Sequence, residues 1–132
     1  MSEQNVRLVR DAYASPGALF ASFSNRMAPE AEFDFTAIYP DRPVLKGVES
    51  LRRFREQGPW EELKYEPGRF LAIDDERVLV LVKVSAVGRG SGVPVELLNA
   101  HEWTIRDGFL VRFKVYRDQA QALAAVGLSE LG

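Results

Sequence analysis

The feature that most constrains the fold is a series of four strand-like segments in the second half of the chain. They cover residues 63–73, 78–87, 93–105 and 109–117, and short turn-forming sequences separate them. Connections this short join neighbouring antiparallel strands, whereas parallel strands need a crossover of a dozen or more residues. The pattern therefore predicts an antiparallel sheet of consecutive strands.

The first half of the chain shows helical spacing in three places. Val6, Val9 and Tyr13 recur every three or four positions and predict a helix over residues 5–14. A second, short helix is expected to begin at Pro16 with Ser15 as its N-cap, and a third covers residues 47–54. Between these two helices, residues 32–36 alternate like a half-buried strand, which Pro29 separates from the short helix, and residues 38–46 form a loop.

A final helix is expected over residues 119–126, with Asp118 as its N-cap and Gly127 as its end. Helices followed by a run of strands are the order of an α+β protein. A chain of 132 residues is the size of one domain, residues 1–132, with enough buried surface for a core and an internal pocket.

Composition excludes several classes of function. Lys and Arg number 17 against 19 Asp and Glu, so the net charge of −2 gives no support for nucleic acid or an anionic membrane as a partner. No apolar run approaches the roughly 20 residues that span a bilayer. The N-terminal residues also lack the basic and apolar segments of a secretory signal. We therefore expect a cytoplasmic protein that does not bind membranes.

Cysteine is absent and His101 is the one histidine. These counts exclude disulfides, a thiolate nucleophile, cysteine metal sites and a zinc site with two histidines from one chain. We expect neither a metal nor a cofactor.

The register of the last hairpin decides which side chains face the interior. A two-residue turn at Asp107 and Gly108 would place Ile105 opposite Leu110 and His101 opposite Lys114. A three-residue loop would place Ile105 opposite Phe109 instead. His101, Trp103 and Ile105 then share a face with Val111, Phe113 and Val115, while Glu102 pairs with Arg112. Because a one-residue slip inverts every side chain, the apolar match favours the longer loop, and His101 is expected to point inward.

This order of elements resembles the nuclear-transport-factor-2-like (NTF2-like) superfamily, and within it the SnoaL-like branch. The resemblance spans the chain. It rests on Gly-Val-Glu-Ser-Leu-Arg-Arg-Phe (residues 47–54), Ala-His-Glu-Trp-Thr-Ile-Arg-Asp-Gly (residues 100–108) and the closing segment, residues 115–128. It implies a curved antiparallel sheet wrapped around N-terminal helices, with a C-terminal helix. The sheet would form a cone with one open end and an apolar pocket.

Proteins of this superfamily include cofactor-independent polyketide cyclases, ketosteroid isomerases and epoxide hydrolases, as well as binding proteins with no known reaction. The resemblance places His101 where ketosteroid isomerases carry an acid that donates a hydrogen bond to a developing enolate oxygen. Their general-base aspartate falls near Phe35, whereas Asp34 is expected to face outward. The inward acid of the cyclases is replaced by Val111, Phe113 and Val115.

Around His101 we expect a pocket wall that binds the ligand. Asn99 would orient His101, Tyr13 and Tyr39 would supply hydroxyl groups, and Trp60 would cap the core or the mouth. The remaining expected ligand-binding residues are Trp103, Phe113, Val115 and Arg117.

Two functions agree with this pocket. The first is an isomerase, cyclase or hydrolase that acts on an apolar carbonyl or epoxide compound, with His101 as the catalytic residue. The second is a ligand-binding or dimerisation module without chemistry, which the lack of a second inward acid favours, because acid/base work on carbon normally needs two groups. In both cases we expect a small apolar ligand.

The outer face of the sheet is also expected to be apolar. Leu79 and Leu81 lie beside Leu98 and Ala100 on that face. Contiguous apolar patches on a surface are frequently interfaces, and most proteins of the resembling superfamily form dimers there. We therefore predict a two-fold homodimer through these four residues.

Overall fold

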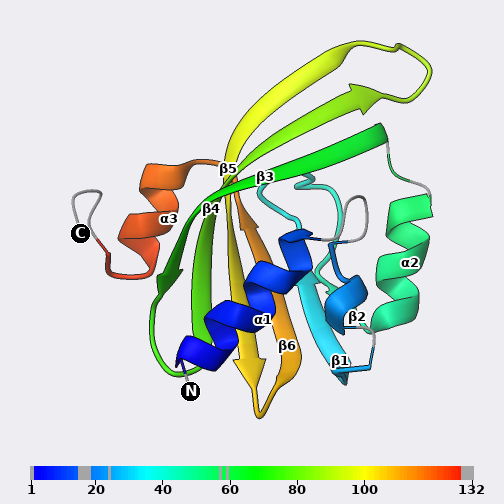
Figure 1. Ribbon diagram of the computed structural model, residues 1–132. Coiled ribbons are helices and arrows are strands. Elements are labelled where there is room, and N and C mark those ends of the chain that lie inside the picture. The colour runs from blue at the N-terminus through cyan, green and yellow to red at the C-terminus, as the bar shows by residue number, and fades with distance from the viewer. Residues whose placement is uncertain (1, 15–18, 24, 57, 59, 129–132) are drawn as a thin grey trace.

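The computed structural model describes residues 2–14, 19–23, 25–56, 58 and 60–128 (Figure 1). Ser15, Pro16 and the side chain of Trp60, for which the sequence makes predictions, lie outside this description. The elements in chain order are α1 (Ser2–Ala14), η1 (Ala21–Phe23), β1 (Met27–Asp34), β2 (Leu45–Lys46), α2 (Val48–Glu56), β3 (Trp60–Ala72), β4 (Arg77–Gly88), β5 (Pro94–Arg106), β6 (Phe109–Tyr116) and α3 (Gln119–Ala125).

The strands form one six-stranded, curved sheet in the order β2-β1-β6-β5-β4-β3. The four long strands pair antiparallel in sequence order, as predicted. β1, for which the sequence pattern predicts no partner, pairs parallel with β6, so the sheet as a whole is mixed. A parallel pair is allowed here because the whole of β2–β5 and α2 lies between the two strands in the chain.

β1 begins earlier than the sequence pattern predicts and contains Pro29. Its pairing with β6 is interrupted between Met27 and Glu32. Because proline has no N–H for a strand ladder, it is tolerated in such an interruption. The proline therefore lies within the strand without ending it.

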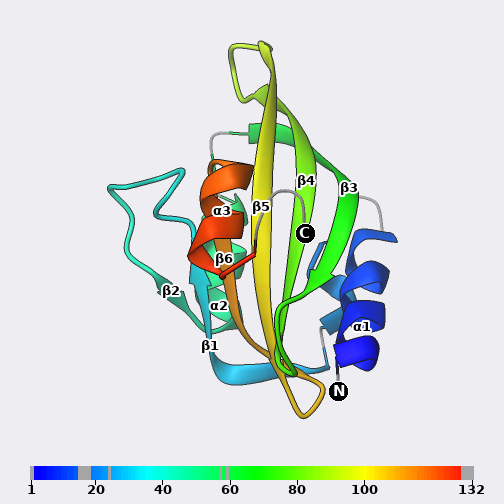
Figure 2. The same ribbon diagram turned by 90° about the vertical axis from the view of Figure 1, so that its left-hand side faces the viewer.

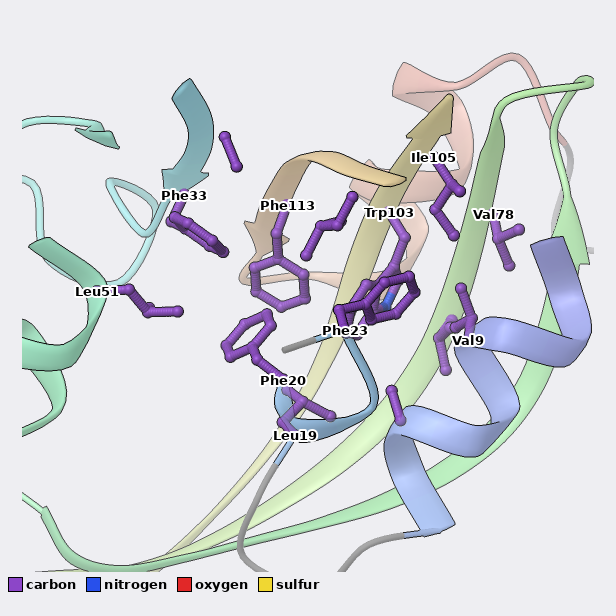
Figure 3. Packing of buried hydrophobic residues seen from close by; sticks show 14 of the residues in the cluster. Val9, Leu19, Phe20, Phe23, Phe33, Leu51, Val78, Trp103, Ile105 and Phe113 are labelled. Carbon is purple, nitrogen blue, oxygen red and sulfur yellow. The ribbon is translucent and has the colours of Figure 1, made fainter. Parts of the chain in front are cut away.

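Helices cover both faces of the sheet. Figure 2 shows α1 and α3 on opposite sides of it. The α1 side holds the main core, in which Val9 of α1 and Phe23 of η1 pack with Trp103 of β5 (Figure 3). Val78 and Val80, which alternate with Leu79 and Leu81 of the predicted outer face, belong to this core. The apolar residues whose spacing predicts α1 thus form the side of the helix that packs on the concave face of the sheet.

The β5–β6 hairpin differs from the predicted register near its tip. Asp107 and Gly108 both have positive φ, 54° and 81°, and form a two-residue turn with Ile105 opposite Leu110. A β-bulge between Thr104 and Ile105 then shifts the pairing, so that the next inward pairs are Trp103 with Phe113 and His101 with Val115. The predicted loop and its pairs, Ile105 with Phe109 and Glu102 with Arg112, were wrong. The predicted inward face of His101 and Trp103 was correct.

α3 begins at the predicted residue and ends at Ala125, one residue before the predicted end. The side chain of Asp118 accepts a hydrogen bond from the backbone N–H of Gln121, and Gly127 follows the helix with a φ of 81°. Residues of α3 pack on the outer face of the sheet, where Leu79 and Ala100 are 0% exposed.

The predicted outer patch is therefore only partly free. Leu79 and Ala100 were expected at an interface between two copies, and α3 of the same chain covers them instead. Burying this apolar face under α3 removes it from water and so stabilises the folded chain. Leu98 remains 63% exposed. None of the described helices is long and apolar enough to cross a membrane.

Candidate functional site

A cavity of about 860 Å³ lies on the α1 side of the sheet. Its wall combines residues from α1, the segment just before η1, the segment after β1, α2 and the long strands. Most of the wall is apolar and aromatic, with Phe20, Phe35, Phe54 and Phe113 among the lining residues. The charged lining residues, which are all exposed, are Arg55, Lys64, Glu66 and Arg89. This is the composition of a site for a small, largely apolar molecule.

Two polar side chains of the cavity wall, Tyr13 and His101, are in hydrogen-bond contact with each other, and Trp103, buried behind the wall, joins them through Tyr13. Tyr13 Oη lies 2.6 Å from Nδ1 of His101. The indole N–H of Trp103 donates a hydrogen bond to the same Tyr13 oxygen over 3.0 Å. The alternation of side chains along β5 directs His101 and Trp103 to one face of the sheet. The helical spacing of α1 directs Tyr13 towards that face, against the core. His101 is 2% exposed.

Burial sets the protonation state of this pair. Burial lowers the pKa of His101 to about 3 and raises that of Tyr13 well above its ordinary value. In both cases the low-dielectric surroundings disfavour the charged form. At neutral pH the site therefore contains a neutral imidazole and a neutral phenol.

Asn99 lies two residues from His101 on the same strand face and also lines the cavity. It is 4% exposed, and its side-chain oxygen has no hydrogen-bond partner among the described residues. Its backbone carbonyl accepts a hydrogen bond from Gln119. Asn99 was expected to orient His101, whereas the hydrogen-bond contact to the His101 ring in the structure is with Tyr13. A buried amide oxygen without a hydrogen-bond donor is costly, and a donor group of a ligand would satisfy it.

The other predicted ligand-binding residues divide into two groups. Tyr39, Phe113 and Val115 line the cavity. Trp103 is fully buried behind the wall and reaches the site through Tyr13. Arg117 is exposed just beyond β6 and is not part of the lining.

Tyr65 is a lining residue that the sequence reasoning missed. Its ring meets that of His101 edge-on, with centroids 5.7 Å apart, and burial raises the pKa of its hydroxyl. Tyr65 pairs with Val84 across β3 and β4, and both face the cavity. Because Leu79 and Leu81 were predicted on the outer face, alternation along the strand makes Val84 face inward. Extending this to its partner on β3 would have found Tyr65.

Among the described residues no buried carboxylate lines the cavity, and the acidic lining residue, Glu66, is exposed. Asp34 lies outside the cavity and accepts hydrogen bonds from the backbone and hydroxyl groups of Thr36. Burial raises the pKa of Asp34, but these hydrogen bonds and the charges of Lys114 and Arg112 outweigh it and lower the pKa. Nor does the described part of the chain contain three acidic, histidine or cysteine side chains grouped to hold a metal.

No protein-family model and no curated protein matches the chain. Solved structures do. An NTF2-like protein from Burkholderia xenovorans is 24% identical, with 96% of this chain and 97% of that chain covered and a TM-score of 0.69.

Two further structures are similar over nearly the whole chain. TerC, co-crystallised with polyporic acid, is 19% identical, with 93% of this chain and 98% of that chain covered and a TM-score of 0.68. A Jannaschia protein named for SnoaL-like polyketide cyclases is 16% identical, with 94% and 89% covered and a TM-score of 0.64. The chain therefore has the NTF2-like fold, as the resemblance implied.

Proposed function

We propose that this protein, which has the NTF2-like fold, is a SnoaL-like protein that binds a small, largely apolar molecule in the cavity beside His101. The observation that carries the proposal is a neutral, buried imidazole in the wall of a cavity of about 860 Å³. Apolar cavities with a few convergent polar groups are the usual form of small-molecule sites. The co-crystal of TerC with polyporic acid shows a protein of similar fold with a small organic molecule and supports the same use here.

The chemistry that the site supports is hydrogen bonding to an oxygen that becomes more negative during reaction. One nitrogen of His101 is held by Tyr13, which leaves Nε2 for a ligand carbonyl or epoxide oxygen. A donor fixed in a dry cavity stabilises an enolate-like or alkoxide-like oxygen more than it does in water. This supports an isomerase, cyclase or hydrolase acting on a carbonyl or epoxide compound.

The second candidate is ligand binding without a reaction. It is favoured by the absence of a buried carboxylate among the described lining residues, where Glu66 is the acidic group and is exposed. Proton transfer from carbon normally needs a base separate from the group that stabilises the oxygen. Turnover of a bound compound distinguishes the two candidates.

Native mass spectrometry of freshly purified protein tests the shared claim. We expect a co-purified small molecule on the wild-type chain and its loss from His101→Ala. Arg117→Ala is the matched control, because Arg117 lies outside the cavity lining and its removal should leave the bound mass unchanged. The proposal fails if no small molecule is retained and a metabolite library produces no thermal shift.

The homodimer and the cytoplasmic location expected from the sequence remain proposals. The face that remains for a partner is the part of the outer sheet around Leu98 that α3 leaves exposed. Leu81 of β4 lies directly opposite Ala100 in the adjoining part of this face.

A further inference from the structure

The hydrogen bonds around Tyr13 constrain where the proton of His101 lies. An indole nitrogen can only donate, so Tyr13 Oη is the acceptor of the Trp103 hydrogen bond. The same oxygen is also 2.6 Å from His101 Nδ1, which is a close hydrogen bond. Tyr13 therefore has one hydroxyl hydrogen and one remaining lone pair with which to meet His101.

Two arrangements of hydrogens are compatible with these contacts. In one, Nδ1 of His101 carries the hydrogen and donates it to Tyr13, and the Tyr13 hydroxyl hydrogen is left without an acceptor among the described residues. In the other, the Tyr13 hydroxyl donates to Nδ1, so the donors of Trp103 and Tyr13 are both paired and the Nε2 hydrogen of His101 is the one left for the cavity. Since an unpaired buried hydroxyl costs about 1–3 kcal/mol, the second arrangement is favoured.

We infer that Trp103 and Tyr13 are positioning residues that hold His101 as the neutral tautomer protonated at Nε2. The cavity then offers a fixed hydrogen-bond donor, and it selects ligands whose polar atom there is an acceptor oxygen over ligands that carry an ammonium group. The selectivity rests on the proposed function, whereas the tautomer does not depend on any ligand.

The surroundings of the imidazole support a fixed donor rather than a base. The rings of Phe113 and Tyr65 pack against it, with centroids 4.9 and 5.7 Å away. Neither a carboxylate nor a cation forms a hydrogen bond or an ion pair with His101 in the described part of the chain. With Nδ1 occupied by Tyr13, the nitrogen left for a ligand is Nε2, and in this arrangement it carries the hydrogen.

Asn99 adds a second contact point to this selection. Its buried amide oxygen has no partner among the described residues, and it lies about 7 Å along the strand from His101, given a rise of about 3.3 Å per residue. The preferred ligand therefore has an acceptor oxygen for His101 and a second polar group, such as a hydroxyl, for Asn99. Its remaining surface matches the aromatic wall.

Nitrogen NMR of the imidazole tests the tautomer directly, because His101 is the one histidine of the sequence. In uniformly ¹⁵N-labelled wild-type protein without ligand, we expect an unprotonated Nδ1 and a protonated Nε2. A spectrum with a protonated Nδ1, or with both nitrogens exchanging rapidly, would overturn the inference. No variant is required for this result.

Removal of one hydroxyl tests the positioning role. In Tyr13→Phe, Nδ1 loses its donor, so we expect the His101 signals to change to a mixture of tautomers. Tyr116→Phe is the matched control, since its hydroxyl donates to Glu102 on β5 away from the cavity lining, and it should leave the His101 signals unchanged. Unchanged signals in Tyr13→Phe would exclude the role. If that variant does not fold, the wild-type spectrum still decides the tautomer.

Binding of three bicyclic probes tests the selectivity. We expect 1-tetralone, which has an acceptor oxygen, to bind at least about tenfold more tightly than tetralin or 1-aminotetralin. Equal or tighter binding of the amine would overturn the selectivity. A protonated Nδ1 together with ketone binding would refute the inference and leave the proposed function standing. A protonated Nε2 with no binding of any probe or library compound would refute the proposed function and keep the tautomer.

Discussion

At the scale of single residues, burial converts His101 from a titrating group into a neutral hydrogen-bonding group. Its surroundings are aromatic rings and one phenol, and the pKa falls to about 3 because the charged form is not solvated there. A histidine with this pKa does not gain a proton between pH 5 and 8, the range in which histidine ordinarily titrates. The site therefore keeps one protonation state under physiological conditions.

The same shift predicts a loss of stability in mild acid. Below about pH 6.5 the unfolded chain protonates His101 while the folded chain does not, so the free energy of unfolding falls as the pH falls. Between pH 7 and pH 5 the loss should be about 2 kcal/mol. Urea denaturation at several pH values measures it.

A His101→Gln variant is the control for this pH dependence. The free energy of unfolding of this variant should change little between pH 7 and 5, because His101 is the one histidine of the sequence. The carboxyls of Asp34 and Asp74, whose pKa values are lowered, lose their contribution to stability only below about pH 4. A wild-type chain that is equally stable at both pH values would contradict the burial of a neutral imidazole.

At the scale of elements, the β5–β6 hairpin shows how a turn and a bulge together place a functional side chain. The two-residue turn by itself would set His101 opposite Lys114, on the wrong face for an apolar core. The bulge between Thr104 and Ile105 corrects the alternation, so His101 pairs with Val115 instead. A choice between turn lengths alone could not find this solution.

Gly108→Ala tests the turn. Gly108 has a φ of 81° and open space where a Cβ would lie. The substitution should therefore lower the free energy of unfolding by about 1 kcal/mol, through the strained backbone conformation alone. Asp107→Asn is the control. Its φ of 54° suits asparagine, and the change should stay within about 0.5 kcal/mol. Chemical denaturation of both variants gives the comparison, and equal stability of Gly108→Ala and wild type would exclude this turn.

At the scale of the whole molecule, α3 decides what the outer face of the sheet can do. It buries Leu79 and Ala100, and its own Ala122 and Leu123 are buried in return. The apolar face predicted as an interface is thus largely an internal contact. What remains exposed is centred on Leu98, with the ion pair of Lys83 and Glu96 beside it on the same two strands.

The dimer prediction is tested by sedimentation at micromolar concentration. We expect the wild-type chain to sediment as a dimer and Leu98→Glu to sediment as a monomer, because a charge at the centre of an apolar contact has to be desolvated. Val48→Glu is the control, since Val48 is 51% exposed on α2, away from the outer face. A wild-type monomer would remove the prediction.

The sequence by itself determined which faces the strands present. Strict alternation along residues 99–105 directs Asn99, His101 and Trp103 to one side, and the apolar partners on the last strand show which side is the interior. Local signals also placed the N-cap at Asp118 and the helix end at Gly127, since each depends on nearby backbone groups.

Only the tertiary structure decided what meets those faces. Tyr13 reaches His101 across 88 residues of sequence, β1 pairs parallel with β6, and α3 covers Leu79. Periodicity states which side of an element is buried but carries no information on its partner. Partners are chosen by packing of distant segments, so the hydrogen bond that holds Nδ1 of His101 could not be found from the spacing of residues.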